Sequence, residues 1–170
     1  MERARRARTD DLPALVHLAA ELRTELRKLR GGRLWEQRDA RVSPDEETLA
    51  ALLRREDAAV VVGTIDGVVV GYGTLEVEPL PDGTALAVIG DLYVEPGARD
   101  VGVGESIATE LVAAAEAAGC IGVDAFALPG HREAKNFFER AGFTARALVM
   151  HKPLTDPPVV DHDGGRAGGR

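Results

Sequence analysis

The chain of 170 residues has the length of one domain with a substantial hydrophobic core. Its formal net charge of -7 argues against nucleic acid as the main partner and favours small cations such as amines. A single cysteine, Cys120, excludes a disulfide framework or a zinc cluster, and no spacing typical of metal ligands occurs. No apolar run approaches the roughly 20 residues of a membrane span. No signal-type segment follows the basic N-terminus, so we expect a cytoplasmic protein.

The first third of the sequence predicts a strand followed by two helices. Residues 3–7 form a short candidate strand, and leucines at helical spacing predict a helix over residues 9–29. Residues 32–42 show neither the helical nor the strand period and contain the only tryptophan. Residues 43–46 form a capping box with proline at the first helical position, which predicts a short helix behind them.

The rest of the chain alternates between strand and helix signals. Residues 60–65 and 68–77 read as two strands joined by Asp66-Gly67, a strong hairpin signal. Residues 85–94 form the next strand. The pattern then predicts a helix, a strand, a helix and a strand in turn, over residues 105–119, 121–128, 132–141 and 143–152. Residues 154–170 lack the apolar content to fold, so we expect a disordered tail after one domain over residues 1–153.

The element order β-α-α-β-β-β-α-β-α-β predicts an α+β fold built on one mixed α/β sheet. Short links make the strands between residues 60 and 94 antiparallel, so the sheet is mostly antiparallel. The helix from Glu105 connects two strands of the same sheet as a crossover. These two strands are therefore expected to be parallel.

The glycine-rich stretch between the strand at residues 85–94 and the helix from Glu105 is the most informative feature. A helix start carries backbone N–H groups without partners and a partial positive charge, which together favour phosphate. Gly102 and Gly104 remove side chains that would keep a ligand away from this backbone. The stretch therefore predicts a pyrophosphate cradle and a nucleotide-like cofactor.

Two motifs carry a resemblance to a known family. Arg99, Gly102 and Gly104 match the Arg/Gln-x-x-Gly-x-Gly/Ala loop of the GNAT superfamily of acyl-CoA-dependent N-acetyltransferases. Residues 131–143, HREAKNFFERAGF, are similar to the family's Asn-x-x-Ala-x-x-Phe-Tyr-x-x-x-Gly-Phe helix. The resemblance covers residues 3–153, and residues 90–94 with Gly119-Cys120 are most similar to small-amine members of the diamine type.

The resemblance implies that acetyl-CoA, or another acyl-CoA, is the acyl donor. Main-chain N–H groups from Arg99 to Gly104 would hold the pyrophosphate, and the backbone at Leu92 and Val94 would pair with the pantetheine arm as an added strand. The cofactor-binding residues expected on this basis are Leu92, Val94, Arg99, Asp100, Val101, Gly102, Val103, Gly104, Glu105 and Phe138.

The chain departs from the family pattern at several of its positions. Asp100 and Val101 stand where the loop usually has glycine and a basic residue, and Glu105 adds a further acidic group beside the phosphate seat. Phe138 replaces the tyrosine that commonly serves as the acid. The two common positions of a glutamate base are Val88 and Gly90. Acid and base must therefore come from elsewhere.

Three residues are candidates for these catalytic roles, each with a structural alternative. Asp91 could act as a base, but strict strand alternation turns it to the opposite face unless a bulge intervenes. Tyr93 has a phenol near the expected thioester path and otherwise reads as a half-buried strand aromatic. His131 could serve as acid or base near neutral pH, or simply cap its helix.

Trp35, Tyr72 and Glu76 are candidates for the acceptor site, although a core tryptophan and a solvated strand face explain them equally well. The function expected is transfer of an acetyl group from acetyl-CoA to a primary amine, most naturally a small molecule, by direct attack in a ternary complex. A catalytically inactive acyl-CoA-binding or regulatory domain, and a protein or peptide N-acetyltransferase, stay open as alternatives. A homodimer also stays open.

Overall fold

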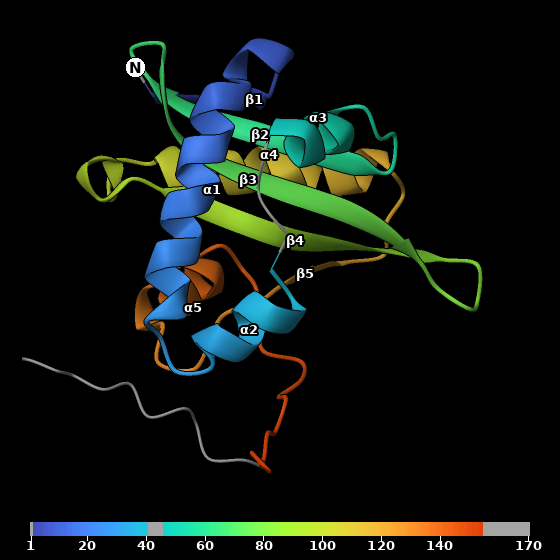
Figure 1. Ribbon diagram of the computed structural model, residues 1–170. Coiled ribbons are helices and arrows are strands. Elements are labelled where there is room, and N and C mark those ends of the chain that lie inside the picture. Colours follow the sequence, from blue (N-terminus) through green and yellow to red (C-terminus); the bar gives the residue numbers. More distant parts are fainter. Residues whose placement is uncertain (1, 41–45, 155–170) are drawn as a thin grey trace, which may run out of the picture.

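The computed structural model describes residues 2–40 and 46–154. It contains a five-stranded sheet in the order β1-β2-β3-β4-β5 (Figure 1). The first four strands are antiparallel neighbours, and the last joins β4 in parallel. Their bounds are Glu2–Arg6 for β1, Ala58–Ile65 for β2, Val68–Pro79 for β3, Ala85–Val94 for β4 and Val123–Ala125 for β5. The expected α+β class, the antiparallel pairing of β2, β3 and β4 and the parallel pairing of β4 with β5 are confirmed.

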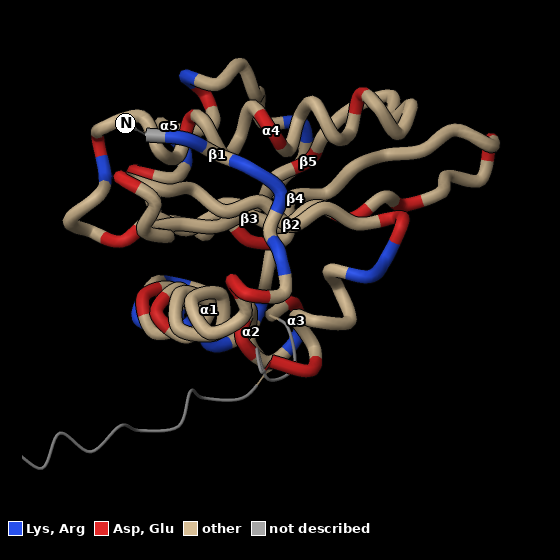
Figure 2. Tube along the Cα trace, turned by 90° about the horizontal axis from the view of Figure 1, so that it is seen from above, with Lys and Arg blue, Asp and Glu red and all other residues tan. Residues whose placement is uncertain are grey.

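Helices cover both faces of the sheet (Figure 2). One face packs against α1 (Leu12–Arg27), entered through a 3-10 turn at Thr9–Asp11, and against α3 (Glu46–Leu53). The opposite face packs against α4 (Val103–Ala117). The short α2 (Gly32–Arg38) follows α1, and α5 (Arg132–Arg140) lies on the α4 side. We call the two sides of the sheet the α1 face and the α4 face.

The α4 helix packs on the sheet at positions where glycines leave room for its side chains. A Cβ on Gly73 would lie 2.8 Å from both Ile107 and Leu111 side-chain atoms. Gly63 and Gly71, on neighbouring positions, meet α4 side chains in the same way. A side chain at any of these positions would push the helix away from the strands and open the core.

A bulge in β4 decides which side chains reach which face. Ile89 is opposite Leu75 and Asp91 is opposite Thr74, so Gly90 has no partner on β3. Because one extra residue reverses the alternation of a strand, Ile89 joins the α4-face core and Tyr93 joins the α1-face core. Sequence alternation required a bulge for Asp91 to reach the face expected of a catalytic base, and this bulge is present.

Several local predictions are confirmed at the level of backbone geometry. Asp66 and Gly67 both have positive φ, 49° and 86°, as the primed turn of a two-residue hairpin requires. The strand at residues 85–94 has the expected bounds, and Gly142 follows α5 with φ of 88°. None of the helices in the described ranges combines the length and the apolar character needed to cross a membrane.

Other boundaries differ from expectation. Residues 32–38, expected to be irregular, form α2, and α4 starts at Val103 rather than Glu105. The strand expected over residues 121–128 is limited to β5. Most of the capping box predicted at residues 43–46 and of the tail predicted at residues 154–170 lies outside the described residues, namely residues 43–45 and 155–170.

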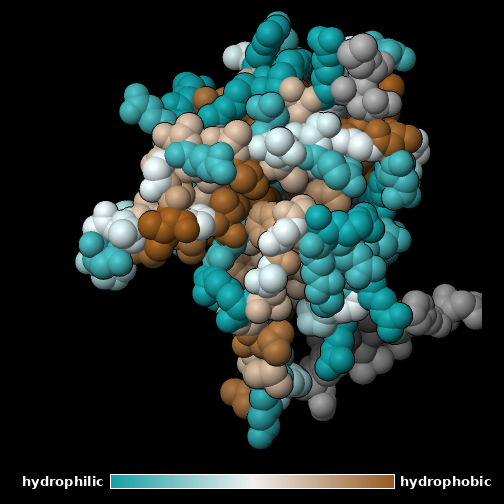
Figure 3. Space-filling view, turned by 180° about the vertical axis from the view of Figure 1, so that it is seen from behind, coloured by the Kyte–Doolittle hydropathy of each residue, from teal (hydrophilic) through white to brown (hydrophobic). Residues whose placement is uncertain are grey.

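The last expected strand, residues 143–152, does not form. This segment runs past β5, and Arg146 Nε donates to the Asp124 carboxylate at 2.7 Å. Its apolar side chains lie on the surface, where Figure 3 shows hydrophobic residues at the lower end of the molecule. Strand-forming residues gain stability from neighbours on which they pack, and Leu148, Val149 and Met150 have none here, being 79–88% exposed.

Candidate active site

Beyond the bulge, β4 has one edge that no described strand covers. The Glu95 N–H donates to the Val70 carbonyl at 2.9 Å, and the carbonyl oxygens of Asp91 and Tyr93 also lie against β3. Since successive residues of a strand direct their main-chain groups to opposite sides, those of Leu92 and Val94 point away from β3. On that side β5 pairs only with residues 87–89. The backbone at Leu92 and Val94 therefore faces outward, as expected for strand addition.

The loop of residues 95–102, which we call the cradle loop, leads from this edge into α4. Asp100 and Gly102 both take left-handed conformations, with φ of 63° and 91°. The first hydrogen bond of the helix runs from the Ser106 N–H to the Gly102 carbonyl at 3.0 Å. The N–H groups of the first helical turn precede that bond and have no partner within the helix, as an anion seat requires.

The two glycines of the loop motif are required for different physical reasons. Gly102 supplies a positive φ at the N-cap of α4 and has open space around it. A Cβ on Gly104 would lie 3.1 Å from the Phe137 ring, so this glycine lets α5 pack against the start of α4. The sequence interpretation assigned both glycines to ligand approach. It missed Phe137, which no local pattern in the loop could reveal.

The side chain of Arg99 turns away from the start of α4. Its guanidinium donates to Glu25 of α1 at 2.6 Å and lies 3.5 Å from Glu133 of α5. Its Nε donates to the Val94 carbonyl at 3.0 Å, and its Cζ lies 5.6 Å from the centre of the Tyr93 ring. The donors of this side chain are thus engaged by two carboxylates and a carbonyl, whereas the sequence prediction for the pyrophosphate concerns the main-chain N–H groups from Arg99 to Gly104.

A small cavity on the α1 face brings together three of the predicted site residues. Trp35, Tyr72 and Asp91 line about 20 Å³ of space, enough for one water-sized group. The remaining walls come from α1 and from the segment just after α2, namely Ala19, Leu22, Arg23 and Ala40. Asp91 is only 9% exposed, and its N–H donates to the Thr74 hydroxyl at 3.0 Å. Arg23 Nε is bound to Glu36 at 2.9 Å.

The other two catalytic candidates lie beside this cavity and outside it. Tyr93 is opposite Tyr72 across the strands and is 5% exposed. Burial, followed by the charge of Glu25, raises the pKa of Tyr93, so its phenol stays protonated at neutral pH. His131 precedes α5 without making a side-chain cap, and its Nε2 lies 3.8 Å from Glu25. His131 therefore lies beside Glu25, the partner of Arg99, and does not line the cavity with Asp91.

The sequence model of the acetyltransferase (GNAT) family matches residues 19–143. The chain belongs to this family. It is therefore an acetyltransferase of the GNAT type, a family whose members use acetyl-CoA as the acyl donor. A search of curated proteins found no match.

Solved structures share this fold at low sequence identity. An acetyltransferase from Trypanosoma brucei is 22% identical, with a TM-score of 0.64 over 91% of this chain and 100% of that one. An aminoglycoside acetyltransferase from an uncultured soil metagenomic sample is 24% identical, with a TM-score of 0.66 over 92% and 97%. Glucosamine-6-phosphate N-acetyltransferase from Arabidopsis thaliana is 18% identical, with a TM-score of 0.64 over 91% and 99%.

Two residues expected in the site make contacts outside the small cavity. Phe138 belongs to an aromatic cluster, with ring centres 5.3 Å from those of Phe137 and Phe143, and packs against the α4-face core. Glu76 pairs with Arg55, which also binds Asp57, and does not line the cavity. Strand alternation does not reveal the placement of Glu76, because its partner Arg55 lies 21 residues away in the sequence.

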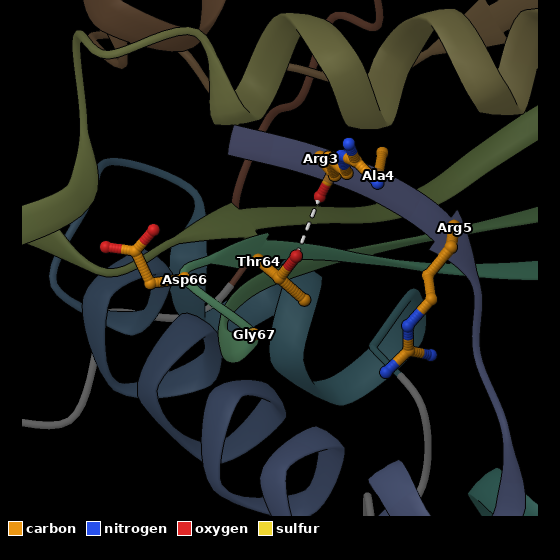
Figure 4. Close-up of a pocket in the computed structure, with 6 residues that line it drawn as sticks. All are labelled: Arg3, Ala4, Arg5, Thr64, Asp66 and Gly67. Carbon is orange, nitrogen blue, oxygen red and sulfur yellow. Dashed lines mark hydrogen bonds between the residues drawn. The ribbon is translucent and has the colours of Figure 1, made fainter. Parts of the chain in front are cut away.

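A second hollow is lined by none of these residues. It measures about 510 Å³ and lies between β1 and the β2–β3 turn. In Figure 4 the Thr64 hydroxyl donates to the Arg3 carbonyl, and the Arg5 side chain leaves the hollow. Arg5 instead forms a bidentate pair with Asp11. This hollow shares no residue with the uncovered edge of β4 or with the small cavity.

Proposed function

We propose that the protein transfers an acetyl group from acetyl-CoA to the primary amine of a small molecule, by direct attack in a ternary complex. The observation that carries the proposal is the position of Asp91. This residue lines the small cavity and immediately precedes Leu92, whose main chain faces the uncovered edge of β4. An acyl donor on the edge and an amine in the cavity would approach the same point of the strand.

The uncovered edge and the start of α4 fit the two halves of acetyl-CoA. The main-chain N–H and carbonyl of Leu92 and the N–H of Val94 suit an amide-bearing arm, while the Val94 carbonyl already accepts from Arg99 Nε. The N–H groups at the start of α4 suit a pyrophosphate. Asp100 and Glu105 are exposed to solvent, so water screens the repulsion between their carboxylates and a pyrophosphate bound to these N–H groups.

The small cavity suits a primary amine. Its volume of about 20 Å³ matches an ammonium group, which has the size of a water molecule. The Asp91 carboxylate and the rings of Trp35 and Tyr72 favour a cation. Arg23 also lines the cavity, but Glu36 balances its charge. The net charge of -7 adds a general attraction for cationic acceptors.

The residues divide the proton transfers among them. Bound acetyl-CoA supplies the thioester, whose C–S bond breaks as the new C–N bond forms. Asp91 accepts the proton that the amine loses, and the Leu92 N–H on the open edge donates to the carbonyl oxygen. Tyr93, held protonated by its raised pKa, is the candidate donor to the departing sulfur.

The test is the release of free CoA thiol from acetyl-CoA in the presence of small primary amines, aminoglycosides and a peptide. We expect turnover with at least one small amine, and a decrease in kcat/KM of about 100-fold or more in Asp91→Asn. Asp82→Asn, in the exposed β3–β4 turn, is the matched control and should retain full activity.

Two other outcomes would replace parts of the proposal. Turnover of the peptide alone would reassign the acceptor to a polypeptide amine. Binding of CoA without turnover on any amine would favour an acyl-CoA-binding module, which the residues Val88, Gly90 and Phe138 at the usual catalytic positions also suggest.

A further inference from the structure

Arg99 and Glu25 join parts of the molecule that are far apart in sequence. The pair connects the cradle loop to α1 across 74 residues, at 2.6 Å. Both side chains are about 30% exposed, so water screens the contact only in part. We propose that Arg99 and Glu25 form a positioning pair that holds the cradle loop in shape, and that Arg99 is not a phosphate ligand.

The first support is the direction and the balance of charge. Glu25 accepts a hydrogen bond from Arg99, and Glu133 lies 3.5 Å from the same guanidinium. Burial acts to lower the pKa of Arg99, but the Glu25 hydrogen bond and the neighbouring charges raise it further, so the group stays cationic. A cation facing two carboxylates contributes little attraction toward an anion at the start of α4.

The second support is the conformation that the pair holds. Asp100, the next residue, has φ of 63°, which is uncommon for a residue other than glycine. Such a conformation persists only where the surroundings enforce it. Arg99 closes the loop on its own strand through the Val94 carbonyl and anchors it to α1 through Glu25. Without that anchor the N–H groups leading into α4 lose their fixed direction.

The first experiment needs no ligand. Amide hydrogen exchange over residues 99–106 is measured in the wild type, in Glu25→Gln, in Arg99→Gln and in the double variant. Each single substitution should accelerate exchange in this segment by about tenfold, because a charge-assisted hydrogen bond is lost. The double variant should exchange no faster than the faster single variant, since both changes remove one contact. Unchanged exchange in Glu25→Gln would overturn the proposal.

The second experiment compares CoA affinity by calorimetry and rests on the proposed function. A positioning pair predicts that both single substitutions weaken binding, each by about fivefold to tenfold. A phosphate ligand predicts opposite signs, because Glu25→Gln would release the Arg99 charge and tighten binding. Tighter binding in Glu25→Gln together with weaker binding in Arg99→Gln therefore refutes the positioning pair.

Glu139→Gln is the matched control for both experiments. It removes the carboxylate of another ion pair, with Lys135 at 2.6 Å on the exposed side of α5, and should change neither exchange nor affinity. The two proposals can fail separately. A wild-type protein that binds no CoA refutes the proposed function, whereas the ligand-free exchange results still decide the role of Arg99 and Glu25.

Discussion

The α4 face and the α1 face are built on the same strands but bury different side chains. The buried residues of α4 are all apolar and pack on a floor that includes Gly63, Gly71 and Gly73. The α1 face buries leucines as well, but also Tyr72, Tyr93, Thr74 and Asp91. Asp11, at the entrance to α1, is a further buried carboxylate on this side of the molecule.

This difference separates packing from chemistry. Apolar contacts on the α4 face need only shape complementarity, whereas each polar group on the α1 face needs a partner to offset its burial. Within the described residues, no buried side-chain nitrogen or oxygen lacks one. The Gly90 bulge connects the two environments, since it places Ile89 in one core and Tyr93 in the other.

Ile89→Asp should have the largest effect, because it places a carboxylate in the apolar core of the α4 face. Ile89 is 2% exposed and packs in this core, whereas Asp91, beyond the bulge, lies on the other face. A carboxylate buried among apolar side chains without a cationic partner is strongly destabilising. We expect a loss of more than about 4 kcal/mol in the free energy of unfolding, measured in urea, or failure to fold.

Gly90→Asp is the control for Ile89→Asp. It adds the same carboxylate at the next residue, and Gly90 is exposed and has no positive φ. This variant should remain within about 1 kcal/mol of the wild type. Equal losses in both variants would mean that the α4 face tolerates a charge as well as the exposed bulge does.

Leu111→Ala tests the packing of the α4 face. Leu111 of α4 is fully buried and packs over Gly73 of β3. The cavity left behind should cost about 3 kcal/mol in the free energy of unfolding. The adjacent Glu110→Ala, on the exposed side of the same helix, should change it by less than about 0.5 kcal/mol. Similar losses in both variants would show that this face contributes no special packing.

The fold was largely predictable because its signals are local. The hairpin at Asp66-Gly67, the strand at residues 85–94 and the glycine after α5 each follow from residue types that strongly prefer one backbone conformation. The prediction of the last strand was wrong because strand formation there is not a local property. Residues 143–152 have strand-forming composition, but strand formation depends on a neighbour that this segment does not have here.

The candidate site was predictable only in part. Alternation alone places Asp91 on the wrong face, and the sequence could name a bulge only as a condition. The direction of the Arg99 side chain depends on Glu25, which no local motif connects to it. Phe137, rather than Phe138, reaches the start of α4 because of how α5 packs in three dimensions. Local sequence motifs do not reveal contacts between residues that are distant in the sequence, and these contacts decide the geometry of the site.

The smallest of the three stability effects concerns Asp11, which fixes the start of α1 to β1. Arg5 binds its carboxylate in a bidentate pair at 2.7 and 2.8 Å, and this hydrogen bonding lowers the pKa of Asp11. The stabilisation is therefore complete above the unfolded-state pKa of about 3.9 and disappears as the pH falls through the lower folded-state value. Asp11→Asn should cost about 1 kcal/mol in the free energy of unfolding at pH 7, since water partly screens Arg5.

The shape of the pH dependence separates this pair from a general acid effect. Stability measured in urea from pH 7 downward should fall less steeply below about pH 4 in Asp11→Asn than in the wild type, because one proton-linked group is gone. Asp10→Asn, which changes the exposed neighbouring carboxylate, should keep the wild-type slope. Parallel curves for the wild type and Asp11→Asn would show that the Arg5 pair adds no stability, and that the α1 face is anchored by its leucines alone.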